Sequence, residues 1–305
     1  MKIAIIGCGA MGSVYAALLA DAGNEVWAID TWQEHIDAIN KKGLHVEGAS
    51  GDRTVKINAS ANAIDAGECD LIIVATKASG VATAAQAAKS ISGPNSVILT
   101  IQNGLGAADR IAEAIDTSQV MIGVVGGFGA SIKQPGHAHH NGMQLVRLGE
   151  MNGGMSERLT TVVETWEKAG FTAKGYPDIH QMIWEKFICN VTYSGPCALM
   201  NATIGEVQAS SEAWSVALNC AKEADAVARA KKIALGFDDV ETYVREFGAN
   251  MPDARPSMLL DHMAKRPSEI DGINGAVPVE AKKIGMSAPI NELLSNLIRG
   301  KEANF

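Results

Sequence analysis

The chain of 305 residues contains few cysteines, few aromatic residues and no excess of positive charge. Its five cysteines are widely spaced and include no C-x-x-C pair, which indicates reduced thiols rather than a disulfide framework. Aromatic residues make up only 5% of the sequence, and the five tryptophans are too scattered to form a platform for stacked bases. The net charge is −8, so the basic surface that nucleic acid requires is missing. We therefore expect a protein without structural disulfides that does not bind nucleic acid.

Long hydrophobic runs are also missing. No apolar run approaches the ~20 residues that a membrane span needs. The first apolar run, Lys2–Ile6, stops at Gly7 and is too short for a signal peptide. The composition, 47% hydrophobic and 20% charged, is that of an ordinary soluble protein. We expect a cytoplasmic protein that acts on a small molecule and binds no membrane; the sequence leaves a monomer and a homodimer open.

A glycine-rich turn between a strand and a helix is the most informative motif. The run Lys2–Ile6 leads into Gly7-Cys8-Gly9-Ala10-Met11-Gly12, a G-x-G-x-x-G, and small and apolar residues with helical spacing follow. In this fingerprint the first glycine allows a tight turn, the second lets the backbone approach a pyrophosphate, and the third lets helix and strand pack closely. The pyrophosphate then lies at a helix N-terminus. Residues 7–12 are therefore predicted to bind a dinucleotide cofactor; an ordinary turn is the alternative.

An acid at the end of the second strand indicates which dinucleotide. Asp30 follows the strand Glu25–Ile29, 18 residues beyond Gly12, where a carboxylate can bind the diol of the adenine ribose. A 2′-phosphate about 4 Å from that carboxylate would be repelled by ~1 kcal/mol in water and ~4 kcal/mol at a surface-like dielectric. We therefore favour NAD(H). NADP(H) stays open because Lys41 or Lys42 can fold back toward this strand.

Strand and helix patterns alternate up to about residue 175, and only helical patterns follow. This order predicts a doubly wound, mostly parallel α/β sheet of the Rossmann type followed by an all-α region. We place the boundary near residue 177, with a dinucleotide-binding domain at 1–177 and an all-helical substrate and dimerisation domain at 178–305. The expected strands are 2–6, 25–29, 44–46, 54–57, 70–75, 96–101 and 120–125, and the expected helices are 10–22, 32–42, 81–91, 107–115, 158–168, 179–193, 212–234, 238–247, 258–266, 273–284 and 290–297.

A histidine-rich segment invites a metal interpretation. Residues 136–149 are predicted to form a hairpin that turns at Asn141-Gly142. Within it, His137 and His139 alternate onto one face of a strand and can share one ion. No carboxylate or cysteine is close in the sequence to complete such a site. We therefore expect an ordinary hairpin strand and no metal.

Two segments carry side chains that suit a reacting carbonyl group. Lys186 and Asn190 are four residues apart and share one face of a predicted helix. A lysine on a largely buried helix can also simply extend its amine to solvent. Gln102-Asn103-Gly104 follows a predicted strand at the edge where cofactors and substrates bind, although by itself it is only a turn.

A third segment, 255–275, completes the set. Ser257 is either a helix N-cap or a ligand-binding hydroxyl, and Glu269 and Asp271 are either solvated loop acids or site residues. Taken together, the segments resemble the ketopantoate reductase (2-dehydropantoate 2-reductase) family over the whole chain. The resemblance implies a Rossmann domain followed by a helical domain like that of 6-phosphogluconate dehydrogenase. The blocks that carry it are GCGAMG, TKA at 76–78, QNG, WEKFICN, RPSMLLD and SEIDGINGAV.

The resemblance implies the reduction of a 2-keto acid, 2-dehydropantoate, to its 2-hydroxy acid by a nicotinamide cofactor. By position, Lys186 matches the family's general acid, whose ammonium stabilises the forming alkoxide and then gives it a proton. Glu269 matches the acid that orients this lysine or contacts the reacting groups, cofactor included. Asn103 matches the residue that positions the nicotinamide side of the site, the lysine and the substrate.

The remaining matches concern substrate and cofactor contacts. Asn190 and Ser257 match residues that hydrogen-bond the substrate, and Lys77 matches a lysine near the cofactor or is merely solvated. Ser194 stands where many members carry a second asparagine, at a substrate-binding position, and Asp30 lies just before the place where many carry an arginine selecting NADP. These departures leave open an NAD-dependent D-2-hydroxy acid dehydrogenase, similar to D-mandelate dehydrogenases. A non-catalytic dinucleotide sensor is the remaining alternative, and it would not need Lys186.

Overall fold

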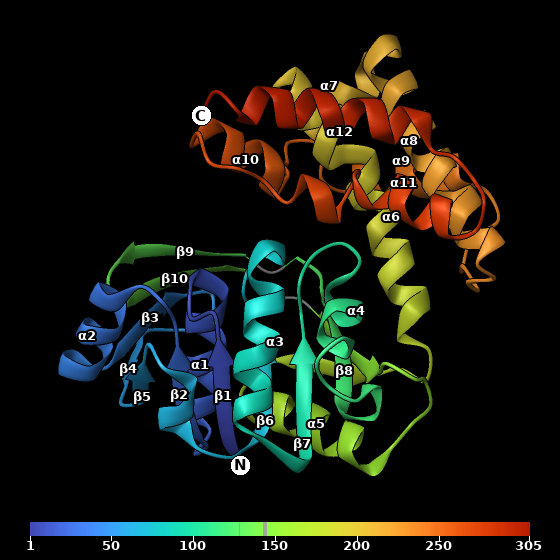
Figure 1. Ribbon diagram of the computed structural model, residues 1–305. Helices are drawn as coiled ribbons and strands as arrows, with labels where there is room; N and C mark the ends of the chain where they lie inside the picture. The colour runs from blue at the N-terminus through green and yellow to red at the C-terminus, as the bar shows by residue number, and fades with distance from the viewer. Residues whose placement is uncertain (128, 143–144) are drawn as a thin grey trace. The chain divides into compact units, whose positions relative to one another are not determined.

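A computed structural model describes residues 1–127, 129–142 and 145–305, and they divide into two units (Figure 1). Unit 1 comprises Met1–Gln102 and Ala107–Ile179; unit 2 comprises Asn103–Gly106 and His180–Phe305. The short segment 103–106 thus belongs to unit 2, although both of its flanks belong to unit 1. None of the helices in the described ranges combines the length and the hydropathy that a bilayer span requires.

Unit 1 is built on an eight-stranded sheet with the strand order β12-β11-β8-β7-β6-β1-β2-β5. Six strands that lie side by side in this order, β5, β2, β1, β6, β7 and β8, are parallel to one another. β11 runs antiparallel to β8. This is the 3-2-1-4-5-6 order of a dinucleotide-binding sheet with two strands added at one edge, so the predicted doubly wound sheet is confirmed. The strands are β1 Lys2–Ile6, β2 Glu25–Ile29, β5 Asn58–Ser60, β6 Cys69–Val74, β7 Ser92–Thr100, β8 Val120–Val125, β11 Leu145–Glu150 and β12 Thr172–Gly175.

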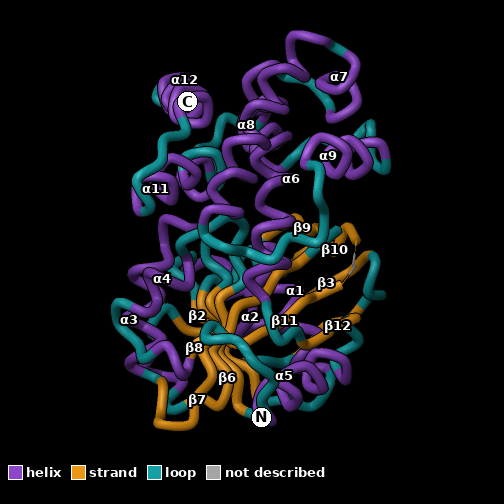
Figure 2. The backbone as a smooth tube through the Cα atoms, turned by 90° about the vertical axis from the view of Figure 1, so that its right-hand side faces the viewer, coloured by secondary structure: helices purple, strands orange, loops and turns teal. Residues whose placement is uncertain are grey.

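Helices cover both faces of this sheet because its strands are apolar on both sides. Successive residues of β1 enter different cores: Ile3 and Ile5 pack with α1 and α5, whereas Ala4 and Ile6 pack with α3 and α4. Figure 2 shows α3 and α4 on one side of the strands and α5 on the other. The helices are α1 Ala10–Asp21, α2 Gln33–Lys42, α3 Val81–Ser90, α4 Ala107–Ala112 and α5 Glu157–Lys168.

Unit 1 contains a second sheet, and its strand pairing shows that the predicted hairpin is wrong. Its order is β4-β3-β10-β9, with β3 at Leu44–Gly48, β4 at Arg53–Val55, β9 at Gly129–Gln134 and β10 at His137–Gly142. The antiparallel pair β3–β4 is as predicted, but β10 pairs with β9 and β3, whereas β11 lies in the large sheet. The hairpin therefore turns at Pro135-Gly136, where Gly136 has a φ of 74°, and not at Asn141-Gly142. Residues 143–144 of the predicted hairpin lie outside the described residues.

Unit 2 is helical, as predicted, and every residue from 180 to 305 is described without a strand among them. Its core gathers buried apolar side chains from α6 and α8 and from the helices packed against them. A buried amide network also joins three segments: Asn274 Nδ2 donates to the Val191 carbonyl at 2.8 Å and to Asn291 Oδ1 at 3.0 Å. The helices are α6 Ile179–Met200, α7 Ile204–Ala209, α8 Ser211–Ala230, α9 Val240–Ala249, α10 Ser257–Met263, α11 Ala276–Lys283 and α12 Pro289–Glu302.

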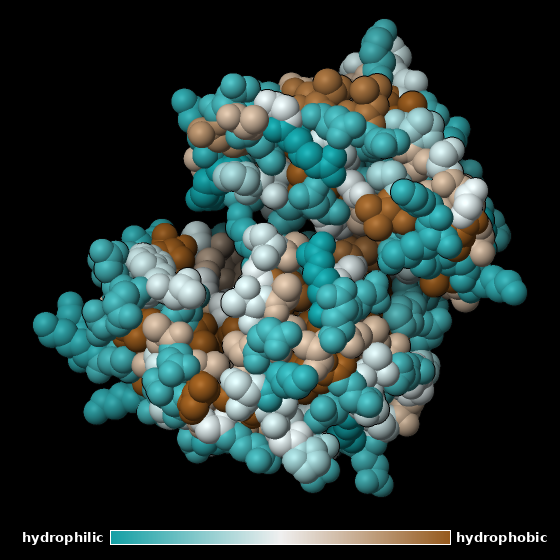
Figure 3. Space-filling model, viewed as in Figure 1, coloured by the Kyte–Doolittle hydropathy of each residue, from teal (hydrophilic) through white to brown (hydrophobic). Residues whose placement is uncertain are grey.

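The outer face of α12 is partly apolar. Leu293 and Leu297 are 59% and 49% exposed, and Ile290 one turn earlier is 37% exposed. An apolar patch lies over this helix in the space-filling view (Figure 3). These three side chains therefore remain uncovered within a single chain.

Candidate functional site

The glycine motif forms the turn from β1 to α1, and its three glycines meet different constraints. Gly7 has a φ of 93°, and a Cβ there would lie 2.6 Å from the backbone nitrogen of Thr76. A Cβ on Gly12 would collide with the carbonyl oxygen of Gly7. A Cβ on Gly9, by contrast, would meet no atom of the described residues within 4 Å. Two glycines thus allow close backbone packing, and the middle one borders open space that a ligand can enter.

The start of α1 offers donors to an anion. Gly9 is the N-cap of this 12-residue helix and provides no side-chain hydrogen bond, and the first turn carries no acidic residue. The first N–H groups of a helix lack intrahelical partners and carry the positive end of its dipole. A pyrophosphate group fits this donor set, since the open space beside Gly9 adjoins it.

Asp30 lies at the same edge of the sheet as the glycine motif. β1 and β2 are adjacent and parallel, with Ile6 opposite Ile29, so the turns that follow them emerge together. Asp30 Oδ1 accepts a hydrogen bond from the Trp32 N–H at 2.9 Å, which fixes the carboxylate. Burial raises the pKa of Cys8 to about 12, and the nearby charge of Asp30 adds to that rise. Unit 1 therefore brings Asp30 and the glycine motif together.

A buried histidine that the sequence analysis did not single out supports this turn. The Gly136 N–H donates to His35 Nδ1 at 3.0 Å, so the ring proton of the neutral imidazole lies on Nε2. Nε2 lies 3.2 Å from Ser13 Oγ, which in turn donates to the Cys8 carbonyl at 3.2 Å. Burial lowers the pKa of His35 and so favours the neutral form that this chain of hydrogen bonds needs. No local motif marks His35, because its partners lie 22 and 101 residues away in the sequence.

Lys77 also follows a strand at this edge. It is exposed and forms the N-cap of a 3-10 turn, η2, at Ala78–Gly80. The preceding strand β6 is a direct neighbour of β1, and the Ala75 N–H donates to the Ile6 carbonyl at 2.8 Å. Lys77 thus lies on the same edge as the glycine motif, and its role there remains a prediction.

Lys186 and Asn103 are in direct contact within unit 2. Lys186 lies in the N-terminal half of α6 and is half-buried, and its Nζ donates a hydrogen bond to Asn103 Oδ1 at 2.8 Å. The two residues are 83 positions apart in the sequence. The lysine therefore does not merely extend into solvent: an amide oxygen holds its ammonium group in one orientation.

Backbone contacts fix the segment that carries Asn103. Gly104 has a φ of 84°, and a Cβ there would collide with the carbonyl oxygen of Gly272. The N–H of Leu105 donates to that same carbonyl at 2.9 Å. Gly272 ends the 3-10 turn η4, Ile270–Gly272, whose N-cap is Glu269. Segment 103–106 is thus docked on the turn that follows Glu269, which explains its membership of unit 2.

The other residues that are predicted to bind the substrate lie on helices of unit 2. Asn190 and Ser194 follow Lys186 at intervals of four residues on α6 and so share its face. Ser194 is buried, with 4% of its surface exposed. Ser257 is the first residue of α10, and Pro256 occupies the N-cap position, so the N-cap interpretation of Ser257 is wrong.

The two acids of the third segment differ in environment. Glu269 is half-buried at the start of η4. Asp271 is exposed, and its Oδ1 pairs with the guanidinium of Arg299 at 2.7 Å. Asp271 is thus a solvated acid with a surface partner, as one interpretation of the sequence expected, and Glu269 is not fully solvated.

The histidines of β10 have a carboxylate neighbour that the sequence does not reveal. Glu47 of β3 lies 3.4 Å from His137 Nε2 and 3.2 Å from His139 Nδ1. The parallel pairing of β3 and β10 brings these residues together across about 90 positions of sequence. Sequence proximity alone was therefore a poor guide to the ligands available here.

Comparison with known proteins matches both halves of the chain. The family model described as ketopantoate reductase PanE/ApbA matches residues 3–153, and the model of its C-terminal part matches residues 178–302. A protein named 2-dehydropantoate 2-reductase from Streptococcus pyogenes serotype M6 is 32% identical over 304 residues, covering 99% of this chain and 98% of that protein.

Solved structures give the same result at the level of the fold. The PanE/ApbA family ketopantoate reductase from Ralstonia eutropha JMP134 has a TM-score of 0.90 and 29% identity, covering 100% of this chain and 99% of the other. A D-mandelate dehydrogenase solved with NADH and anilino(oxo)acetate has a TM-score of 0.89 and 28% identity, again over 100% and 99% of the two chains. The predicted resemblance is confirmed, and the chain belongs to the ketopantoate reductase family of oxidoreductases.

Proposed function

We propose that this protein reduces 2-dehydropantoate to pantoate with a nicotinamide cofactor, preferably NAD(H), and that Lys186 is the general acid. The observation that carries the proposal is the 2.8 Å hydrogen bond from Lys186 Nζ to Asn103 Oδ1, at the two positions where the family resemblance expects the acid and the amide that orients it. When bound, the cofactor supplies the hydride that reaches C2 of the keto acid. The full-length relatives named 2-dehydropantoate 2-reductase support this choice of substrate.

The lysine acts on the oxygen of the reacting carbonyl group. That oxygen gains negative charge as C2 is reduced, and an ammonium group beside it stabilises the charge. A proton then moves from Lys186 Nζ to the oxygen and yields the hydroxyl of the product. General acid catalysis of this kind contributes about 10²–10⁴-fold to a rate. Asn103 keeps the ammonium group in place by accepting one of its hydrogens.

In this proposal unit 1 binds the pyrophosphate and the adenine ribose of the cofactor, and we assign residues 1–177 to a cofactor-binding domain. The backbone of residues 7–12 binds the pyrophosphate, and Asp30 binds the adenine ribose. Lys77, Asn103 and Glu269 contact the cofactor on its other parts. The D-mandelate dehydrogenase complexes with NADH support a nicotinamide nucleotide in a fold of this kind.

Residues 178–305 then supply most of the groups that bind the keto acid. The amide of Asn190 and the hydroxyls of Ser194 and Ser257 hydrogen-bond the polar groups of the substrate, and Glu269 orients Lys186 or contacts the reacting groups. The half-buried positions of Asn190 and Glu269 suit contact with a small polar ligand, whereas Ser257 is exposed at the start of α10.

A D-2-hydroxy acid dehydrogenase is the second candidate. It is supported by the D-mandelate dehydrogenase whose structure covers the whole chain at a TM-score of 0.89. Asp30, which disfavours a 2′-phosphate, also agrees with an NAD enzyme of this kind. Such an enzyme would share Lys186 and the glycine motif and differ in the pocket for the side chain of the acid.

Transfer of deuterium tests the proposal. The protein is incubated with 2-dehydropantoate and NADH in which both hydrogens at C4 of the nicotinamide are deuterium, and the products are analysed by mass spectrometry. We expect pantoate that carries deuterium at C2 together with NAD⁺. If NADH binds but neither NADH oxidation nor labelled hydroxy acid appears, with this substrate or with benzoylformate, the protein is a dinucleotide sensor and the proposal is wrong. Labelled mandelate without labelled pantoate would favour the second candidate.

A further inference from the structure

One face of the small sheet in unit 1 carries a row of metal-ligating side chains. β3 and β10 are parallel neighbours, with His45 opposite His137 and Glu47 opposite His139. Because side chains alternate along a strand, these four project from the same face. The alternate residues Leu44, Val46 and Ala138 are fully buried in the main core of unit 1. The polar face is thus a consequence of strand register.

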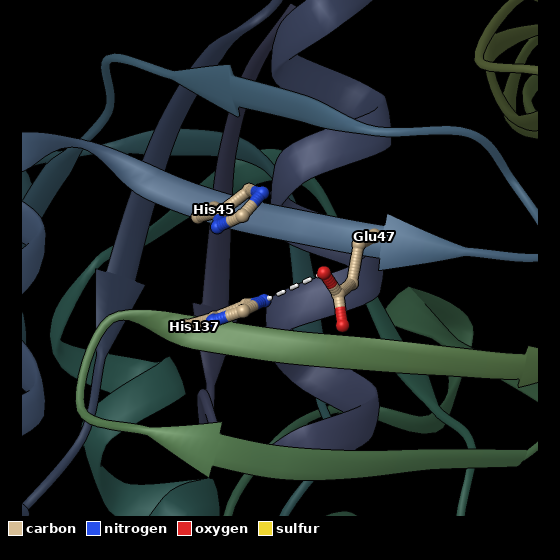
Figure 4. A group of neighbouring side chains, drawn as sticks. All are labelled: His45, Glu47 and His137. Atoms are coloured by element: carbon tan, nitrogen blue, oxygen red, sulfur yellow. Dashed lines mark ion pairs between the residues drawn. The ribbon is translucent and has the colours of Figure 1, made fainter.

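Three of these side chains converge on one point. One ligand atom each from His45, Glu47 and His137 lies within 4.8 Å of the other two. Figure 4 shows Glu47 reaching from β3 toward His137 on β10, with His45 beside them. The imidazole rings of His45 and His137 are stacked, with centroids 4.0 Å apart. A tetrahedral ion with bonds of about 2.0 Å holds its ligand atoms about 3.3 Å apart, so each pair of ligand atoms would have to approach by at most about 1.5 Å.

His137 has an unsatisfied nitrogen in this cluster. Its Nε2 is buried and makes no hydrogen bond in the described part of the chain, although Glu47 Oε2 is 3.4 Å away. A buried polar atom without a hydrogen bond is costly unless a water or an ion satisfies it. A cation between this nitrogen and the carboxylate would satisfy both groups.

Neighbouring groups orient the ligands as outer partners of metal sites do. His45 Nε2 lies 2.8 Å from Asp52 Oδ1, so the Nε2–H group can donate a hydrogen bond to the carboxylate and leave the Nδ1 lone pair for a metal. His139 Nδ1 lies 3.2 Å from Glu47 Oε1 and holds that carboxylate from the other side.

A cavity next to the two stacked histidines gives access from solvent. It has a volume of about 420 Å³, and its lining includes His45, His137, Thr54 and Gln134. Three protein ligands leave a coordination position that a water molecule from this cavity can fill. Lys42 also lines the cavity, and its charge limits the affinity for a cation.

From this arrangement we propose that His45, Glu47 and His137 bind one divalent transition-metal ion, of which Zn²⁺ is the probe. Two imidazoles and one carboxylate form a donor set that suits zinc and the other late first-row ions and does not suit Mg²⁺. The ion would link β3 to β10 and so stabilise the small sheet. The site is separate from the proposed reaction: it needs neither Lys186 nor the glycine motif.

The test is direct measurement of metal binding to the full chain without a histidine tag. The protein is freed of metal with a chelator and titrated calorimetrically with Zn²⁺ and, separately, with Mg²⁺. We expect one Zn²⁺ per chain, no saturable Mg²⁺ binding, and a higher Tm in Zn²⁺ for the wild type. Because all five cysteines are buried, surface thiols do not compete for zinc in this titration. Co²⁺ should give the visible absorption of a tetrahedral site.

Variants identify the ligands. His45→Gln, Glu47→Gln and His137→Gln should each raise the Kd for Zn²⁺ at least tenfold, and His180→Gln, in the other unit, should leave it unchanged. Circular dichroism shows which variants are folded; His45 and Glu47 are each about one-third exposed, so their substitution does not disturb the core. The proposal is overturned if the wild type shows no saturable Zn²⁺ binding, or if the folded variants bind Zn²⁺ as tightly as the wild type.

Discussion

The ammonium group of Lys186, held by Asn103, is the residue-scale centre of the proposed chemistry. Lys186→Ala should lower kcat by about 10²–10⁴-fold, because both the charge and the transferable proton are lost. The Kd for NADH, measured by fluorescence titration, should stay within about twofold, since the glycine motif is untouched. Lys168→Ala, which removes an exposed lysine from α5, is the control and should keep wild-type turnover. Wild-type turnover in Lys186→Ala would contradict the assigned role.

Asp30 should decide between the two nicotinamide cofactors. Its carboxylate is fixed by the Trp32 N–H and would repel a 2′-phosphate at about 4 Å by ~1–4 kcal/mol. Asp30→Ala should therefore lower the ratio of kcat/KM for NADH to that for NADPH by about tenfold or more, a change that steady-state assays measure directly. An unchanged ratio would mean that other residues set the preference.

Buried neutral His35 should make stability depend on pH. Its pKa is lowered from the usual 6.5 by burial, so below about pH 6.5 the unfolded chain binds a proton that the folded chain does not. Stability is therefore complete above this pH and falls as the pH drops, by at most about 1.4 kcal/mol per pH unit for this one group. Urea unfolding of wild type and His35→Gln between about pH 7.5 and pH 5.5 measures the effect. The variant should be less stable at pH 7.5 and show the smaller loss on acidification; equal losses in both proteins would contradict this account.

The sequence located part of the candidate site and missed the rest for one physical reason. The glycine motif and Asp30 are predictable because their spacing follows from a local strand–turn–helix unit. Local patterns singled out Lys186 and Asn103 separately, but only the family resemblance linked the two residues, because their contact spans 83 residues. His35 and Glu47 gave no signal at all, since tertiary pairing alone brings them to Ser13 and to the histidines of β10.

At the scale of an element, a substitution in the turn from β1 into α1 should affect cofactor binding without affecting stability. Among the residues that the structure describes, a Cβ at Gly9 would meet no atom within 4 Å, so Gly9→Ala should leave the Tm nearly unchanged. The added methyl group would occupy the space where the pyrophosphate approaches, and the Kd for NADH should rise at least tenfold. Gly300→Ala in α12, where a Cβ also has open space, is the matched control and should bind NADH as the wild type does. If Gly9→Ala binds NADH as tightly as the wild type does, the cofactor does not bind at this turn.

Long buried elements were predicted well, and short or exposed ones were not. β6 and β8 are nearly continuous apolar runs, and both appear within one residue of the expected bounds. The three-residue β5, the largely exposed β9 and the six-residue α7 carry too little periodicity to be recognised. The hairpin was misplaced because Asn141-Gly142 has turn chemistry, whereas Pro135-Gly136 makes the turn, and burial of Ala138 holds β10 against the core.

At the scale of the whole molecule, the order of the strands and helices specifies the architecture more firmly than any boundary. An alternating half followed by a helical half requires a doubly wound sheet and a helical unit, and both are present. Segment 103–106 belongs to unit 2, where the Leu105 N–H donates a hydrogen bond to the Gly272 carbonyl. No periodic pattern in the sequence predicts this contact. A boundary near residue 177 between two domains therefore remains a proposal.

The most direct test of the central claim is a comparison of kcat/KM for four keto acids with NADH and with NADPH. The acids are 2-dehydropantoate, phenylpyruvate, benzoylformate and 2-ketoisovalerate. The account predicts the highest value for 2-dehydropantoate, and a higher value with NADH than with NADPH. If another acid is preferred by tenfold or more, about 1.4 kcal/mol of transition-state stabilisation, this protein is a different 2-hydroxy acid dehydrogenase on the same fold and the assigned substrate is wrong.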